Sequence, residues 1–127
     1  MLELTAPVAA ALGATMIALS IRVSMRRKAL GVSLGDGGDA VLLVRMRAFG
    51  NFAEFVPLAL FLVALAELRG APGWAVLAAG WGLVAARLLH AAGLDAQRTM
   101  VPARLAGTLG TFAAMTLAGG AALLAAG

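Results

Sequence analysis

Three polar residues with complementary chemistry stand inside an otherwise apolar segment of the chain. Arg47 carries a guanidinium that only donates, Asn51 an amide that donates and accepts, and Glu54 a carboxylate that accepts. On a helix of about 3.6 residues per turn, Asn51 and Glu54 both fall within about 40° of Arg47 around the axis. The three side chains therefore share one stripe and face the same neighbour.

A charged stripe on an apolar membrane helix is costly where it faces lipid, so such residues normally face protein or a wet cavity. Pro57, one turn further on, lacks the N–H that would bond the carbonyl of Ala53, which frees a backbone acceptor near the stripe. The residues alone leave two interpretations. In the first, Arg47 and Glu54 neutralise each other or pair between helices, and Asn51 is a hydrogen-bonding link between helices. In the second, the stripe lines a binding pocket.

A second polar cluster, Arg87 and His90, ends a later apolar run. Antiparallel helices place the end of one beside the start of the other, so this cluster can converge with Arg47, Asn51 and Glu54. A lone histidine in such a place is more often a hydrogen-bonded side chain than a catalyst. One histidine and scattered carboxylates lack the spacing of metal ligands, and we expect no metal site.

The elements that must position these residues are membrane helices. The chain has 127 residues, of which 62% are apolar and 13% charged. A soluble domain of this size could not hide that much apolar surface, because a small body leaves much of its surface exposed. Four apolar segments are each long enough to cross a bilayer, which takes about 20 residues. We expect one all-α domain, an integral membrane four-helix bundle, with spans at approximately 5–25, 40–68, 73–94 and 103–125.

Basic residues give the chain its formal charge of +4, and they flank the hydrophobic runs. They do not follow a polar face with interleaved aromatic residues, so we expect no nucleic-acid partner. The connections after the first and third spans hold nearly all of them, and Lys and Arg gather on the cytoplasmic side of membrane helices. Both termini should therefore face away from the cytoplasm.

Small residues are abundant in the last apolar run, including Gly107, Gly110 and Thr111. Small side chains let membrane helices approach closely. This pattern has two interpretations, close packing in a bundle or oligomer and simple tolerance of small residues.

Four parts of the sequence form a more specific pattern: GDGG at 35–38, RAFGNFAEFVP at 47–57, Glu67, and ARLLHAAG at 86–93. Together they resemble the MAPEG family, the membrane-associated proteins of eicosanoid and glutathione metabolism, and especially its small bacterial members. The resemblance covers roughly residues 20–108. It implies a four-helix protomer that assembles as a homotrimer, with glutathione between neighbouring subunits near the cytoplasmic side.

The resemblance also implies roles for single residues. In relatives, the arginine, asparagine and glutamate of the second string help to bind glutathione, and these positions are Arg47, Asn51 and Glu54 here. Glutathione offers two carboxylates, an amine and amides, which suit these three side chains. Arg87 and His90 match third-helix positions that also line the site in relatives.

The chain departs from its relatives at several positions. Relatives commonly have an aromatic hydroxyl where this chain has Phe55, and bacterial relatives often have histidine in place of Phe49. The activating arginine of catalytic relatives lies near the start of the fourth helix, where Arg98 and Arg104 are rival candidates. Such an arginine stabilises the glutathione thiolate, which is the nucleophile of the reaction.

The resemblance therefore implies a glutathione-dependent transferase or peroxidase of the bacterial inner membrane, whose thiolate attacks a lipophilic electrophile that arrives from the bilayer. The alternative is a non-catalytic MAPEG-like scaffold or ligand-binding protein. A small multidrug transporter has a similar length, but its essential carboxylate belongs in the first span, and the segment that follows Glu3 contains none before the first loop. The second substrate stays open.

Overall fold

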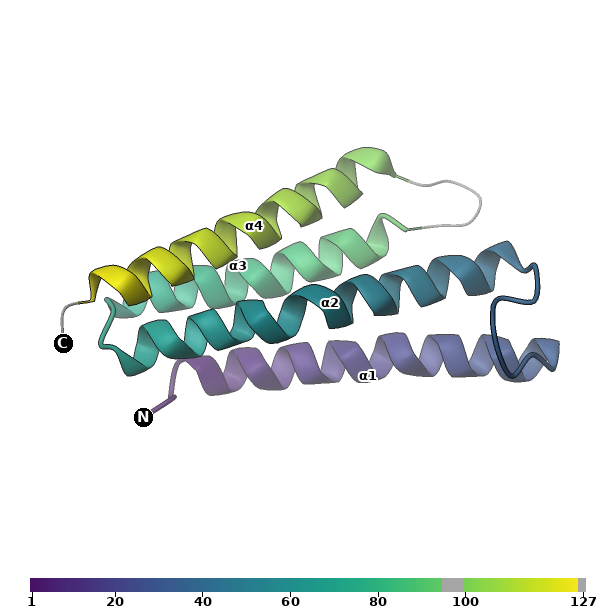
Figure 1. Ribbon diagram of the computed structural model, residues 1–127, viewed down its shortest axis with the longest axis horizontal. Helices are drawn as coiled ribbons and strands as arrows, with labels where there is room; N and C mark the ends of the chain where they lie inside the picture. The colour runs from purple at the N-terminus through teal and green to yellow at the C-terminus, as the bar shows by residue number, and fades with distance from the viewer. Residues whose placement is uncertain (95–99, 126–127) are drawn as a thin grey trace.

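Four long helices make up the protein in the computed structural model, which describes residues 1–94 and 100–125. They are α1 (Thr5–Leu30), α2 (Ala40–Leu68), α3 (Gly73–Ala92) and α4 (Val101–Leu124), and the described residues contain no strand. All four are long and apolar enough to cross a membrane, as expected for an all-α integral membrane protein. The start of α1 and the end of α4 lie at one end of the bundle, and the α1–α2 connection lies at the other (Figure 1).

The end of α1 and the start of α4 differ from the expected spans, and a glycine or a proline lies at each of these positions. α1 continues past residue 25 to Leu30, because no helix-breaking residue intervenes before Gly31, whose φ of 67° ends the helix in the left-handed region. α2 runs through Pro57 without a break. α4 begins at Val101, with Pro102 in its first turn, where a missing N–H costs little. Which residues lie inside the bilayer stays a prediction.

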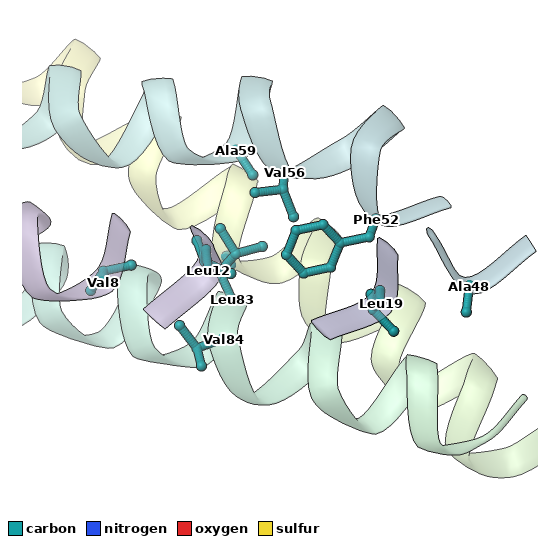
Figure 2. Packing of buried hydrophobic residues seen from close by; sticks show 10 residues of the cluster. Val8, Leu12, Leu19, Ala48, Phe52, Val56, Ala59, Leu83 and Val84 are labelled. Carbon is teal, nitrogen blue, oxygen red and sulfur yellow. The ribbon is translucent and has the colours of Figure 1, made fainter. Parts of the chain in front are cut away.

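The core consists of small and branched side chains from all four helices. A first buried cluster surrounds Phe52 of α2, and Figure 2 shows this ring between Leu12 and Leu19 of α1 and Leu83 of α3. A second cluster, nearer the chain termini, contains Val63, Ala66, Val76, Ala79, Ala118 and Ala122. α1 contacts α2 and α3 but not α4 within the described residues. The α2–α3–α4 side of the bundle is therefore the side on which three helices can share a site.

Two charged side chains at the end of α2, Glu67 and Arg69, hydrogen-bond to the start of α1 and the end of α4. The Glu67 carboxylate accepts hydrogen bonds from the backbone N–H of Thr5, at 2.8 Å, and from its hydroxyl at 2.5 Å. Arg69 donates to the carbonyls of Ala122 and Ala125, at 2.6 and 3.2 Å. A carboxylate at a helix N-terminus and a cation at a C-terminus satisfy unpaired backbone groups and complement the helix dipole.

Asp39 fixes the opposite connection, between α1 and α2. Its carboxylate caps α2 by accepting the N–H of Leu42 at 2.7 Å, and it pairs with both Nε and Nη2 of Arg26 at 3.0 and 2.6 Å. The Arg26 guanidinium holds the pKa of Asp39 below its usual 3.8. This pair ties the end of α1 to the start of α2, the helix that carries Arg47, Asn51 and Glu54.

We expect the thermal stability of the protein in detergent to fall in acid, in part through Asp39. Because the pKa of Asp39 is lower in the folded state, its contribution is complete above the unfolded value of 3.8 and is lost as the pH falls through the folded value. Melting curves between neutral pH and about pH 3 measure this. Asp39→Asn should melt lower than the wild type at neutral pH and lose part of the acid dependence.

Glu3→Gln is the matched control, because Glu3 is an exposed carboxylate at the start of the chain. It should keep the wild-type acid profile. If Asp39→Asn and Glu3→Gln give the same profile, the pair with Arg26 contributes no measurable stability.

The membrane orientation can be tested in a chain that has no native cysteine. Leu34 lies in the α1–α2 loop with 87% of its surface exposed. Since basic residues favour the cytoplasmic side, Leu34→Cys in intact bacterial cells should resist a membrane-impermeant thiol reagent, whereas Glu3→Cys should react. Both should react after lysis, and the opposite pattern in intact cells would reverse the orientation.

Candidate functional site

A cavity of about 750 Å³ opens between α2, α3 and α4, at the bundle end that carries the α1–α2 loop. It is lined by Leu43, Val44, Met46, Arg47, Gly50, Asn51 and Glu54 of α2, His90 of α3, Leu94 just beyond α3, and Arg104 of α4. Volumes of about 300–1,000 Å³ are typical of small-molecule sites. The three residues of the predicted stripe thus share one cavity with His90 and Arg104.

The two charged residues of the stripe are exposed on the protomer. Arg47 and Glu54 lie at the surface of α2, whereas Asn51 is half-buried. The ion pairs among the described residues are Arg26 with Asp39 and the N-terminal amine with Glu3, so neither Arg47 nor Glu54 belongs to one. Within the described protomer, mutual neutralisation of this stripe has no ion pair to support it.

Arg87 lies behind Asn51 and does not line the cavity. Only 1% of its surface is exposed. It donates hydrogen bonds to Oδ1 of Asn51 at 2.5 Å and to Oγ1 of Thr111 at 3.3 Å. Its guanidinium carbon lies 6.0 and 5.9 Å from the ring centres of Phe52 and Phe55, within range of a cation–π contact. The family resemblance implies that Arg87 lines the site, whereas in the structure Arg87 contacts the cavity residue Asn51 from the core.

His90 is buried at the wall of the cavity and hydrogen-bonded to α4. Its Nδ1 lies 3.2 Å from the carbonyl oxygen of Arg104 and 3.3 Å from Oγ1 of Thr108. A carbonyl only accepts, so a hydrogen bond at this contact requires the proton on Nδ1. The described residues contain no group of three His, Cys, Asp or Glu side chains that could hold a metal ion.

Of the two rival arginines near α4, the described residues include Arg104 and not Arg98. Arg104 lies in the first turn of α4, is exposed, and lines the cavity opposite the stripe. Arg98 lies outside the described residues. Of the two, Arg104 is therefore the one whose guanidinium can be placed beside a ligand in this cavity.

Close packing of α3 against α4 makes these contacts possible. A Cβ at Gly107 would lie 2.7 Å from the carbonyl oxygen of Ala86 and 2.7 Å from the backbone nitrogen of His90, and one at Gly110 would lie 2.9 Å from the Cβ of Ala86. All three distances are too short for a real side chain. At these two positions the small residues of α4 serve close packing, one of the two interpretations of the sequence pattern.

Two threonines of α4 contact residues at the cavity, although the sequence pattern indicated Thr111 only as a small residue and did not indicate Thr108. Thr111 accepts from Arg87 and donates to the carbonyl of Gly107 at 2.8 Å, and Thr108 contacts His90. With Arg104 they follow a spacing of four and then three residues, which places them on one helix face. That spacing is the signal in the sequence that could have revealed them.

The fold and the cavity define a membrane four-helix bundle with a polar site near one end. The model of the MAPEG family matches residues 5–124, and the chain belongs to this family. The Inner membrane protein YecN of Escherichia coli strain K12 is 36% identical over 75 residues, which cover 59% of this chain and 57% of YecN. YecN of Escherichia coli O6:H1 gives the same values. The match thus spans little more than half of these relatives, and no solved structure matches significantly.

We expect Gly107→Ala to lower the melting temperature in detergent, because the new methyl group forces α3 and α4 apart at His90. Overpacking of this kind costs about 1–3 kcal/mol. Gly120→Ala, on the same helix, is the matched control, since a Cβ there meets nothing within 4 Å. It should melt at or slightly above the wild-type temperature, and equal melting of the two variants would contradict the close packing.

Proposed function

We propose that the protein binds glutathione in this cavity and is a glutathione-dependent transferase or peroxidase of the bacterial inner membrane. The observation that carries the proposal is the convergence of Arg47, Asn51 and Glu54 with Arg104 in one cavity of about 750 Å³. Glutathione has two carboxylates, one ammonium and two amides. The guanidinium of Arg47 and the carboxylate of Glu54 complement a carboxylate and the ammonium group of this ligand, the amide of Asn51 can hydrogen-bond to it, and Arg104 adds a second positive charge.

The spacing of the stripe also suits an extended tripeptide. Arg47 and Glu54 are separated by about 10 Å along the helix axis, at about 1.5 Å per residue. An extended chain of three residues spans about 10 Å. Arg47 would thus pair with a carboxylate at one end of glutathione, and Glu54 with the ammonium group at the other, which leaves the thiol between them.

Arg104 of α4 lines the same cavity as the stripe and would act on that thiol. A neighbouring guanidinium lowers the pKa of a thiol and so raises the fraction of thiolate at neutral pH. In the transferase reaction, the thiolate sulfur bonds to an electrophilic carbon, the leaving group departs with its electron pair, and the thiol proton passes to solvent. Arg98 remains the alternative source of this guanidinium.

The exposure of Arg47 and Glu54 supports assembly as an oligomer, and we propose the homotrimer that the family resemblance implies. Lipid cannot solvate these charges, and facing it would cost several kcal/mol for each. A neighbouring subunit would cover the open side of the cavity and leave room for the ligand. We therefore propose that glutathione binds between subunits, and the oligomer mass in detergent measures the number of chains.

The proposal is tested by calorimetric titration of the purified protein with glutathione. Arg47→Ala and Glu54→Gln should each weaken binding by about tenfold or more, because each removes one ion of a charge-assisted hydrogen bond, and hydrogen bonds to charged groups contribute about 1.5–3 kcal/mol. Arg22→Ala is the matched control: Arg22 is an exposed arginine of α1 and should not affect binding. Absence of binding by the intact protein would refute the proposal.

Turnover is measured on the same variants with a chlorinated nitroaromatic electrophile. Arg104→Ala should lower kcat more than it weakens binding, because its charge acts on the thiolate and less on the rest of the ligand. Binding without turnover by the intact protein would instead identify a non-catalytic ligand-binding member of the family.

A further inference from the structure

The contact between Arg87 and Asn51 fixes which side of the Asn51 amide faces the ligand. A guanidinium has only N–H donors. The atom that meets Nη2 of Arg87 at 2.5 Å must therefore be the carbonyl oxygen of the amide, Oδ1. The two N–H donors of Asn51 are then on the side away from Arg87, and Asn51 lines the cavity.

We propose that Arg87 is a positioning residue that makes Asn51 a hydrogen-bond donor in the cavity, so that this position binds an acceptor oxygen of the ligand, a carboxylate or carbonyl, and rejects an N–H group. This inference rests on the proposed function for the identity of the ligand. The inference adds two points to that function: Asn51 acts as a donor toward the ligand, and Arg87 is the residue that fixes this role.

Arg87 is held firmly enough to impose this orientation. It is 1% exposed, and the rings of Phe52 and Phe55 lie against its guanidinium. Thr111 uses its own proton on the carbonyl of Gly107, so its oxygen is left to accept from Arg87. Rotation of the Asn51 amide would bring N–H groups against N–H groups at this contact.

The charge of Arg87 also strengthens the donors of Asn51. None of the ion pairs among the described residues includes this buried guanidinium. Its positive field acts on the amide in a region of low dielectric constant, where hydrogen bonds in a chain polarise one another. The amide N–H groups therefore favour an anionic acceptor, which matches a carboxylate of glutathione better than its ammonium group.

Asn51→Asp provides the decisive test, because it keeps the contact with Arg87 and removes the N–H donors that would bind the ligand. Aspartate keeps an oxygen for Arg87, so the melting temperature without ligand should equal or exceed that of the wild type. It has no N–H, and the affinity for glutathione should fall by at least about tenfold. If Asn51 instead offered its carbonyl to the ligand, Asn51→Asp would bind glutathione as well as the wild type, and that result would overturn the inference.

A double-mutant cycle on glutathione affinity tests the role of Arg87. Arg87→Met should weaken binding in the wild-type background but have little further effect in the Asn51→Ala background, where no amide remains to be oriented. Arg87→Lys, which keeps a donor and the charge, should restore part of the loss. A purely structural role would give the same loss in both backgrounds and would overturn the inference.

The failures of the two proposals can be told apart. If the intact protein binds no glutathione, the proposed function fails and this inference fails with it. If the intact protein binds glutathione and Asn51→Asp binds equally well, only the inference fails.

Discussion

Hydrocarbon offers no hydrogen bonds, so a polar group on a membrane helix must find its partner within the protein. Glu67 and Arg69 meet this constraint at one end of the bundle by bonding the backbone of α1 and α4. Arg87 meets it in the interior through Asn51 and an α4 hydroxyl. Arg47, one turn before Asn51, is exposed and joins no ion pair among the described residues. In the proposed function, a ligand or a second subunit at the cavity supplies the partner of this charge.

Much of this arrangement follows from the sequence, because a membrane allows few architectures. Apolar runs of sufficient length predict the four helices, and a helical repeat of about 3.6 residues places Arg47, Asn51 and Glu54 on one side of α2. All three do line one cavity. The ends of the helices follow local signals instead: α1 extends to Leu30, because apolarity says where a helix can cross lipid and not where its backbone stops.

The position of Arg87 could not be predicted in the same way. Arg87 and His90 are three residues apart, so both lie on one broad face of α3, and periodicity does not say which points to the core. That depends on α4, which approaches closely at Gly107 and brings Thr111 within 3.3 Å of the guanidinium. Phe55 adds to this environment, since its ring lies near Arg87 and 5.8 Å from the ring of Phe112.

A buried arginine without a carboxylate partner is not expected to stabilise the fold. Desolvation of the charge is expensive, and apolar residues of similar volume often replace buried charges without loss. Nε of Arg87 finds no acceptor among the described residues, which adds to this cost. The proposed role of this charge at the cavity, to orient Asn51 and add a positive field next to a ligand, gives a reason for the cost. In that proposal the binding half of the site depends on a core residue of α3, whereas activation of a thiol would fall to Arg98 or to Arg104, of which Arg104 lines the cavity.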